Sequence, residues 1–425
     1  MTVLAAPQLP DVLGNAVGLK CRECGALGQL DDSYACFECF GPLEVAYRPV
    51  AVDRSDITAG PPSMWRYAPF LPVAPGQSAR PGLEPGLTRL VRADNLARTL
   101  GVRSLWIKDD SGNPTHSFKD RVVAVALQNA LRLGFRTIAC ASTGNLANAV
   151  AAAAARAGLE SVVFVPADLE AGKIVTTAVY GGTLVAVGGT YDDVNRLCTE
   201  VAAARGWGFV NVNLRPYYAE GSKTVGFEIA EQLGWRLPDA VVAPVASGSL
   251  LTKVDKAFGE FVTSGLVAPA QPRIFGAQAS GCSPVAAAFH SGANVVRPVR
   301  PATIAKSLAI GNPADGPYAL DVVRRTSGAI TDVSDAQIVE GIQLLARTEG
   351  IFAETAGGVV VANYLHQLRE GLLSPDEEVV LLNTGDGLKT LDAVVDVARP
   401  TLSVSPAFDD FESAFAALPG TGAGR

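Results

Sequence analysis

The sequence predicts an α/β protein built on open parallel sheets. From about residue 120, short apolar segments alternate with longer segments of helical periodicity, a pattern typical of strands covered by helices on both faces. Hydrophobic residues make up 48% of the chain and charged residues 18%, which suits a large buried core. The length of 425 residues allows two such α/β domains.

The alternation can be followed element by element. Strands are expected at residues 104–108, 137–141, 162–165, 183–187, 209–212, 241–245, 274–278 and 379–382. Helices are expected at 120–133, from 145 to 157, from about 172, 191 and 221, and near 334–349 and 356–370. Gly158 directly follows the Ala-rich second helix and suits a helix C-cap.

Composition divides the chain into four parts. We expect a small cysteine-containing segment over 1–50, then a Pro- and Gly-rich linker over 51–110 that leads into the large domain. The α/β core is expected over 111–400, with a smaller domain at roughly 120–215 inside it. Residues 401–425 are expected to form a largely flexible tail.

Four of the seven cysteines lie in the first 40 residues. Cys21 and Cys24 form one C-x2-C pair, and Cys36 and Cys39 form a second. Two turns that each offer two thiolates are the usual way to build a tetrahedral zinc site. Four cysteines leave no open coordination position, so we expect a structural zinc ion. The alternative is a knuckle of reduced thiols that has lost its metal.

Charge and hydropathy exclude several classes of partner. The net charge is −7 and no Lys/Arg-rich block occurs, so nucleic acid is not an expected partner. No segment is apolar for about 18 residues, and the N-terminus has no basic region followed by an apolar one. We therefore expect a cytoplasmic protein that does not bind membranes.

Residues 112–121, Gly-Asn-Pro-Thr-His-Ser-Phe-Lys-Asp-Arg, carry an unusually placed lysine. The Gly-Asn-Pro turn leads to Thr115 and Ser117, which are good N-caps, and an apolar run follows from Val122. Lys119 is therefore expected in the first turn of a helix, where the partial positive charge of the N-terminus disfavours a cation. That position favours the neutral amine that bonds an aldehyde cofactor. The alternative is a surface lysine beside a capping motif.

Three loops that follow expected strands carry the other candidate groups, since ligands of parallel sheets bind at the carboxyl ends of strands. The first holds Ser142, Thr143 and Asn145, and the third holds Thr384. The second suits a phosphate cup at a helix N-terminus and consists of Ala246, Ser247, Gly248, Ser249 and Leu250. Alternatively, these are ordinary turn and capping residues. Together with Lys119 they offer what a pyridoxal-phosphate site needs.

The sequence resembles the threonine synthases, pyridoxal-phosphate enzymes of fold type II. The resemblance runs from about Gly112 to Thr390, and a cysteine knuckle at the front is frequent in that family. It rests on five motifs: Asn-Pro-Thr-His-Ser-Phe-Lys-Asp at 113–120, Ala-Ser-Thr-Gly-Asn at 141–145, Glu-Gly-Ser-Lys-Thr at 220–224, Thr-Ile-Ala-Lys-Ser-Leu-Ala-Ile-Gly-Asn-Pro at 303–313, and Thr-Gly-Asp-Gly-Leu-Lys-Thr at 384–390. The first two also occur in related dehydratases and cysteine synthases.

The resemblance implies a fold, a cofactor and a reaction. It implies two α/β domains with pyridoxal 5′-phosphate between them, bonded to Lys119, and a homodimer. Asn145 falls where the family contacts the cofactor 3′-oxygen, and Thr384 where it faces the ring nitrogen. The loop 246–250 falls where it holds the cofactor phosphate. The implied reaction converts O-phospho-L-homoserine and water to L-threonine and phosphate, the last step of threonine biosynthesis.

The chain departs from the family pattern at the substrate phosphate. The usual arginine of Asn-Pro-x-Arg is Tyr218 here, and an arginine occurs three residues earlier at Arg215. We expect Arg215 to hold the substrate phosphate, aided by Lys223 and by the hydroxyls of Ser142 and Thr143. Two other functions remain open. One is a threonine or serine dehydratase that eliminates from Cβ, and the other is a binding protein that has lost catalysis.

Overall fold

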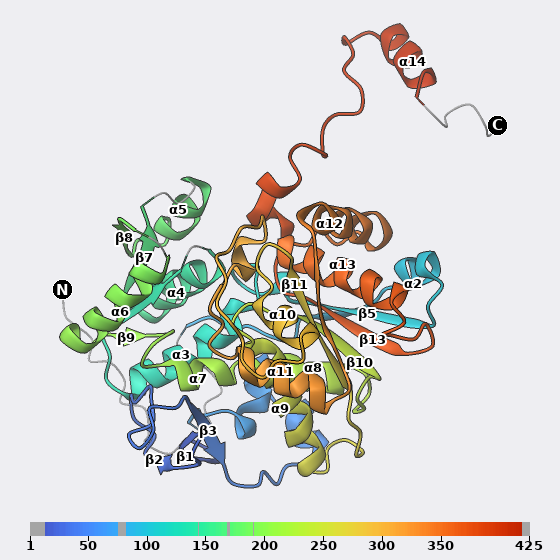
Figure 1. Ribbon diagram of the computed structural model, residues 1–425. Coiled ribbons are helices and arrows are strands. Elements are labelled where there is room, and N and C mark those ends of the chain that lie inside the picture. The colour runs from blue at the N-terminus through green and yellow to red at the C-terminus, as the bar shows by residue number, and fades with distance from the viewer. Residues whose placement is uncertain (1–12, 75–81, 143, 168–170, 190, 419–425) are drawn as a thin grey trace. The chain divides into compact units, whose positions relative to one another are not determined.

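A computed structural model describes residues 13–74, 82–142, 144–167, 171–189 and 191–418. It divides into two units, one ending at Lys389 and the other beginning at Thr390. The first unit holds all three sheets (Figure 1). In the described residues, no helix is both long and apolar enough to cross a lipid bilayer.

The N-terminal segment forms a small antiparallel ribbon. Its strands are β1 (Ala16–Cys21), β2 (Leu27–Gly28) and β3 (Leu43–Tyr47), in the order β2-β1-β3. The chain then passes through α1 (Arg54–Thr58) and a 3-10 helix, Met64–Phe70. Met64 and Trp65 of that helix belong to the main apolar core, so the segment packs on the body of the protein.

The smaller sheet is entirely parallel and has the order β8-β7-β6-β9. Its strands are β6 (Thr137–Ala141), β7 (Glu160–Pro166), β8 (Thr183–Val187) and β9 (Gly208–Phe209). Its helices are α3 (Lys119–Arg132), α4 (Asn145–Ala157), α5 (Ala171–Ala178) and α6 (Tyr191–Arg205).

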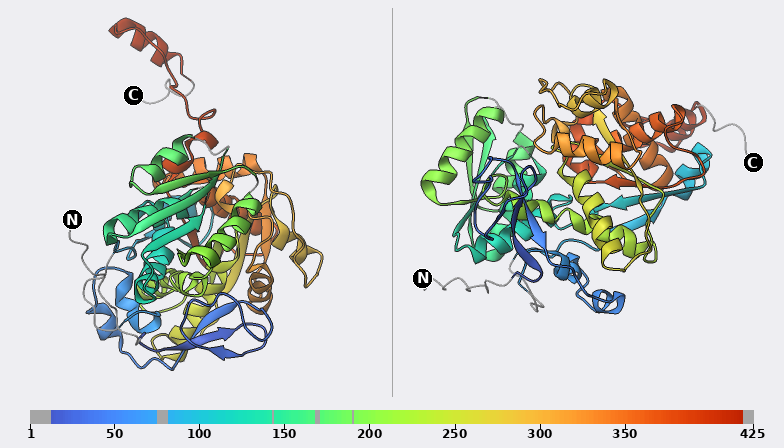
Figure 2. Two further views of the ribbon diagram at one scale, coloured as in Figure 1. Left: turned by 90° about the vertical axis from the view of Figure 1, so that its left-hand side faces the viewer. Right: turned by 60° about the horizontal axis from the view of Figure 1, so that its bottom comes forward.

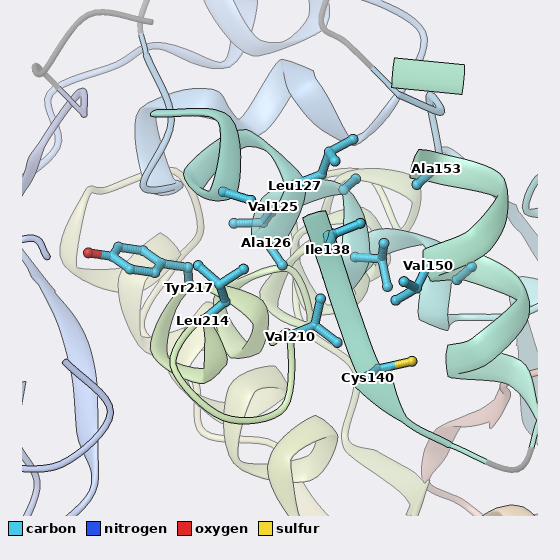
Figure 3. Packing of buried hydrophobic residues seen from close by; sticks show 14 of the residues in the cluster. Val125, Ala126, Leu127, Ile138, Cys140, Val150, Ala153, Val210, Leu214 and Tyr217 are labelled. Carbon is cyan, nitrogen blue, oxygen red and sulfur yellow. The ribbon is translucent and has the colours of Figure 1, made fainter. Parts of the chain in front are cut away.

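Alternating residues of β6 explain how the helices cover both faces. Ile138 and Cys140 pack with α3 and α4 in one buried cluster, drawn in Figure 3. Ala139 and Ala141 pack with residues of α6 in a second cluster. Because successive side chains of a strand point to opposite faces, the all-apolar strand needs helices on both sides.

The larger sheet has the order β12-β11-β10-β13-β5-β4, parallel except for its edge strand β4. Its strands are β4 (Arg89–Arg92), β5 (Ser104–Asp109), β10 (Ala240–Pro244), β11 (Arg273–Ala279), β12 (Ile330–Val333) and β13 (Glu378–Asn383). Side chains of α8 (Lys223–Gln232), α9 (Ser249–Thr263), α10 (Pro284–His290) and α11 (Gly316–Arg325) share one apolar cluster with this sheet. The remaining helices of the domain are α2 (Asp94–Leu100), α12 (Asp335–Glu349) and α13 (Thr355–Arg369), and α13 contacts four of the strands. The two sheets lie in separate parts of the first unit (Figure 2).

The point between β10 and β13 is where the chain changes direction across the larger sheet. From β10 the chain proceeds outward through β11 and β12, whereas β5 lies on the other side of β13. The loops after β10, β13 and β5 therefore open at one edge of the sheet, beside such a switch point. Ligands of open α/β sheets bind at this place.

Several elements differ from those expected from the sequence: α10, α11 and β12, for example, lie in a stretch for which no element was expected. The strand expected at 209–212 ends at Phe209, because Asn213 Oδ1 accepts the Phe209 N–H at 2.8 Å and folds the chain into a turn. The unexpected helix α7 (Arg215–Glu220) follows, with Pro216 in its first turn. In the second unit, α14 (Phe408–Ala416) is a helix inside the segment expected to be a flexible tail. Residues 419–425 lie outside the described residues.

Candidate active site

A pocket lies at the carboxyl ends of the strands, beside the switch point. The residues that line it come from the starts of α3, α4, α9 and α13, from α7 and the residue after the Gly221 that follows it, from the end of β10 and the loop after it, from a 3-10 helix (Lys306–Leu308) and from the loop after β13. They are Phe118, Lys119, Asn145, Tyr218, Ser222, Pro244, Ala246, Ser247, Gly248, Ser249, Leu250, Ser307, Leu308, Glu354, Ala356 and Thr384. The fold thus brings together Lys119, Asn145, Thr384 and the whole of the loop 246–250.

Lys119 is the first residue of α3, as the sequence predicts. The start of this helix is anchored at the loop after β13, because the Thr384 carbonyl accepts the Phe118 N–H at 2.9 Å. The Lys119 side chain is half-buried, and its Nζ lies 5.1 Å from the centre of the Phe118 ring. The amine therefore has a defined place at the edge of the pocket.

The neighbouring Arg121 fixes the first turn of α3 from behind. Its guanidinium is fully buried and pairs with Asp110, after β5, at 2.7 Å and with Glu228 of α8 at 2.5 Å. Removing one partner of such a buried pair is strongly destabilising, so the pair ties α3 to the larger sheet. Lys119 is thus held between the two sheets by groups that do not line the pocket.

The expected capping of α3 by Thr115 and Ser117 is wrong. The N-cap residue is Phe118, and its side chain cannot cap. The Thr115 hydroxyl instead donates to Asp120 Oδ1 at 2.7 Å, and the Thr115 N–H donates to Oδ2 at 2.7 Å. Asp120 therefore closes the loop ahead of the helix, and its burial raises its pKa to about 6.

The loop 246–250 surrounds the N-terminus of α9. Gly248 is the N-cap residue, with φ of +95°, and the helix begins at Ser249. A Cβ at Gly248 would lie 2.7 Å from the carbonyl oxygen of Asp315, so only glycine fits. The free backbone N–H groups of such a helix start, with two serine hydroxyls beside them, suit a bound phosphate.

A buried carboxylate, Glu354, connects two of the predicted site residues. Its Oε2 accepts the Asn145 amide at 2.8 Å, and its Oε1 accepts the Thr384 hydroxyl at 3.2 Å. Burial raises the pKa of Glu354, and the Asn145 contact and the positive charge of Lys389 oppose this shift. Glu354 could not be recognised from the sequence, because one glutamate ahead of a helix is a common arrangement without a functional pattern. The structure also explains Gly385, since a Cβ there would lie 2.5 Å from the Glu354 carboxylate.

Two of the residues expected to contact substrate, Lys223 and Ser142, do not line the pocket. Lys223 is fully buried and binds Glu220 at 2.8 Å and Glu260 at 2.9 Å, so its placement is at odds with a substrate-phosphate role. The Ser142 hydroxyl accepts the N–H groups of Gly144 and Ala147 and so serves the start of α4. Thr143 lies outside the described residues.

Arg215 lies one helical turn before Tyr218, which lines the pocket. Its Nη2 is 2.8 Å from Asp315 Oδ2, and its side chain keeps 31% of its surface exposed. The Asp315 N–H donates to the Ser247 carbonyl at 2.8 Å. Arg215 is therefore held beside the loop 246–250 rather than inside the pocket.

The four ribbon cysteines form a compact cluster in which all Sγ atoms lie within 4.8 Å of one another. The Cys21 and Cys39 sulfurs are 3.5 Å apart, and those of Cys24 and Cys36 are 3.6 Å apart. Tetrahedral zinc with Zn–S bonds of about 2.3 Å sets its sulfurs about 3.8 Å apart. Backbone N–H groups point at Sγ of Cys21 and Cys36, each at 3.4 Å. These distances suit a metal with four thiolate ligands.

A family model described as pyridoxal-phosphate dependent enzyme matches residues 83–385, a range that contains the whole pocket. The chain belongs to this family. Among curated proteins, it is 36% identical to the threonine synthase of Methanosarcina acetivorans over 401 residues, covering 93% of this chain and 98% of the relative. It is 35% identical to that of Methanocaldococcus jannaschii, covering 91% and 96%. The threonine synthase of Mycobacterium tuberculosis is 34% identical, covering 80% and 91%.

Solved structures resemble the chain in fold. A processed threonine deaminase from Solanum lycopersicum has a TM-score of 0.63 at 22% identity, covering 82% of this chain and 90% of that one. Maize serine racemase has a TM-score of 0.60 at 21% identity, covering 73% and 91%. These likenesses confirm the fold-type II architecture.

The residues of the pocket fit the cofactor of the family. Lys119 offers an amine at the pocket edge, and the glycine-capped start of α9 offers N–H donors for a phosphate. Asn145 and Thr384 bring an amide and a hydroxyl to the same pocket. Pyridoxal phosphate needs these kinds of group for its aldehyde, phosphate and ring substituents.

Proposed function

We propose that this protein is a threonine synthase that converts O-phospho-L-homoserine and water to L-threonine and phosphate. The observation that carries the proposal is a lysine amine and a phosphate loop in one pocket, with an arginine beside that loop. Relatives named threonine synthase, 34–36% identical over 80–93% of the chain, support the same reaction.

Lys119 is the residue that bonds the cofactor and moves protons. When bound there, pyridoxal phosphate supplies the electron sink that makes the substrate's α- and β-hydrogens acidic. The Lys119 amine takes and returns these protons, because it is a positioned base at the pocket edge. Phosphate leaves Cγ with the C–O bond electrons, water adds at Cβ, and Cγ ends as the methyl group of threonine.

The other site residues bind and orient. The loop 246–250 holds the cofactor phosphate through the α9 N-terminus. Asn145 and Thr384 contact the cofactor ring, and Glu354 orients both of them through its two hydrogen bonds. Arg215 supplies the cation for the substrate phosphate, because guanidinium groups bind phosphate at two points. Support for this role is its contact with Asp315 beside the loop 246–250, one helical turn before Tyr218 of the pocket.

Cys21, Cys24, Cys36 and Cys39 bind a structural zinc ion. The Sγ distances of 3.5 and 3.6 Å support this proposal. Resemblance to the family alone supports a homodimer in the cytoplasm, and sedimentation of the purified protein tests the dimer.

An assay that follows phosphate and threonine together tests the reaction. Purified holoenzyme incubated with O-phospho-L-homoserine is expected to release both in a 1:1 ratio. Incubation with threonine or serine, followed for ammonia and 2-oxo acid, tests the dehydratase alternative. Rapid ammonia release from threonine without any threonine formed from phosphohomoserine would contradict the proposal.

A further inference from the structure

One arginine of the N-terminal ribbon, Arg22, contacts a residue beside the active-site pocket. Arg22 lies between the ligand pair Cys21 and Cys24, and its Nη1 is 3.0 Å from Asp315 Oδ1. Its guanidinium carbon lies 3.5 Å from the centre of the Tyr318 ring, a cation–π contact. The Tyr318 hydroxyl donates in turn to Glu23 of the ribbon. Arg22 is only 16% exposed, so these contacts define its place.

Asp315 divides its carboxylate between two arginines. Oδ1 pairs with Arg22 at 3.0 Å and Oδ2 pairs with Arg215 at 2.8 Å. The same residue supports the phosphate loop, since its N–H donates to the Ser247 carbonyl and its carbonyl oxygen packs against Gly248. Asp315 thus joins the ribbon, the phosphate loop and helix α7.

The sharing of Asp315 by two arginines affects how Arg215 can bind a phosphate. A carboxylate normally binds one guanidinium through both oxygens, which would neutralise Arg215 and occupy two of its five donors. With Oδ1 taken by Arg22, Arg215 makes no other hydrogen bond through its guanidinium within the described part of the chain. The remaining guanidinium donors of Arg215 are therefore available to an anion.

We propose that Arg22 is a positioning residue for the substrate phosphate: by sharing Asp315, it leaves donors of Arg215 free to bind that phosphate. The proposal rests on the function proposed above. It makes the cysteine ribbon part of the specificity for phosphorylated substrates.

A second set of contacts holds the ribbon on the same helices. Glu44 of β3 pairs with Lys253 of α9 at 2.9 Å, and Lys253 pairs with Glu220, the last residue of α7, at 2.7 Å. The Tyr47 hydroxyl donates to Glu220 Oε2 at 2.8 Å. Strand β3 is therefore fixed to α7, which carries Arg215, and to α9, which begins at the phosphate loop. Arg22 lies on the ribbon and Arg215 lies on α7. Because these contacts fix the ribbon to α7, they also fix the position of Arg22 relative to Arg215.

Substitution of Arg22 tests the proposal in the holoenzyme, where the cofactor already fills the loop 246–250. Arg22→Ala is expected to raise KM for phosphohomoserine about tenfold while kcat changes less than about twofold, because the groups at the reacting atoms are untouched. Arg22→Lys keeps a cation on Asp315 and is expected to restore KM to within about threefold of wild type. Lys20→Ala removes an exposed ribbon cation two residues away and serves as the matched control.

Calorimetric titration of the holoenzyme with inorganic phosphate gives a readout that needs no turnover. The Kd for phosphate is expected to weaken about tenfold in Arg22→Ala and to stay unchanged in Lys20→Ala. In an Arg215→Ala background, Arg22→Ala is expected to have no further effect, since Arg22 acts through Arg215.

The outcomes separate this proposal from the proposed function. Equal phosphate affinity in Arg22→Ala and Lys20→Ala, or additive losses in the double variant, would overturn the role of Arg22. Arg22-dependent phosphate binding in a protein that forms no threonine would support the role of Arg22 and overturn the proposed reaction.

Discussion

At the scale of single residues, Lys119 owes its place to neighbours that do not line the pocket. Lys119→Ala is expected to abolish turnover and leave the fold intact, because one half-buried amine contributes little to stability. Arg121 and Asp110 would still hold the start of α3. Borohydride reduction and peptide mapping of the wild-type holoenzyme should place the cofactor on Lys119. A label on another lysine would contradict the assignment.

Glu354 accepts two hydrogen bonds with one carboxylate, which an amide of the same shape cannot do. In Glu354→Gln, one oxygen becomes an NH2 group, so either Asn145 loses its acceptor, at a cost of about 1–3 kcal/mol for a buried group, or the Thr384 hydroxyl must reverse and accept from that NH2 group. Cofactor affinity is expected to fall by roughly tenfold or more, measured by titrating the apoenzyme and following absorbance. Glu370→Gln, at the exposed far end of α13, is the control and should bind the cofactor normally. Unchanged affinity in Glu354→Gln would remove Glu354 from the site.

At the scale of elements, the phosphate loop depends on one left-handed residue at the start of α9. Gly248→Ala is expected to weaken cofactor binding and to destabilise the protein by at least ~1–2 kcal/mol, because φ is +95° and the new Cβ meets Asp315. Gly259→Ala lies in the interior of the same helix, with no atom within 4 Å of the added Cβ. That change should stabilise by roughly 0.5–1 kcal/mol. Urea unfolding of both variants checks whether the first is less stable and the second more stable than the wild type.

Many strands and helices of the core could be predicted because they are apolar and periodic. β6 and β8 match the expected ranges, and Gly158 caps α4 with φ of +70°, as expected. Helix α7 could not be predicted, because it depends on the Asn213 side chain folding back on Phe209. Local propensity does not reveal such a contact.

The candidate site was predictable where local motifs define it and unpredictable where it depends on tertiary contacts. Lys119, Asn145 and Thr384 follow recognisable motifs at strand ends, and the fold brings them to one pocket. The expectations for Lys223 and Ser142 depended on side-chain direction. The carboxylates around Lys223 and the N–H groups around Ser142 are set by tertiary packing, which sequence spacing does not encode.

At the scale of the whole molecule, buried ion pairs make stability depend on acid. Burial alone would raise the pKa of Glu228, but Arg121 and Lys108 outweigh it and lower the pKa to about 2. Its stabilising contribution is therefore complete above pH ~4.5, the unfolded value, and is lost as pH falls toward 2. The free energy of unfolding in urea is expected to fall across that range.

Glu228→Gln tests whether the Glu228 carboxylate causes this loss of stability in acid. The substitution leaves Arg121 and Lys108 without their shared carboxylate. The free energy of unfolding at neutral pH should therefore fall by about 3–5 kcal/mol. Between pH 4.5 and 2, the free energy of unfolding of the variant should then fall by less than that of the wild type. An identical slope between pH 4.5 and 2 in both proteins would assign the acid sensitivity to other carboxylates.

The ribbon does not line the pocket, but Arg22 connects it to Asp315, which supports the loop 246–250. Freshly purified protein is expected to contain about one zinc per chain, and chelation should loosen the ribbon while cofactor absorbance persists. Because Arg22 contacts Asp315, chelation is also expected to raise KM for phosphohomoserine. Metal analysis that finds less than ~0.2 zinc per chain would count against a four-cysteine site.

The position of β13 has a consequence for how the protein is made. It is the last strand to be synthesised, yet it lies between β10 and β5 in the middle of the larger sheet. A nascent chain that has not reached Glu378 therefore carries two open inner strand edges, which are prone to wrong pairing. It also lacks Thr384 and the loop that anchors Phe118. Capture of the cofactor is thus a late event, and the appearance of its absorbance would mark the moment at which the sheet closes.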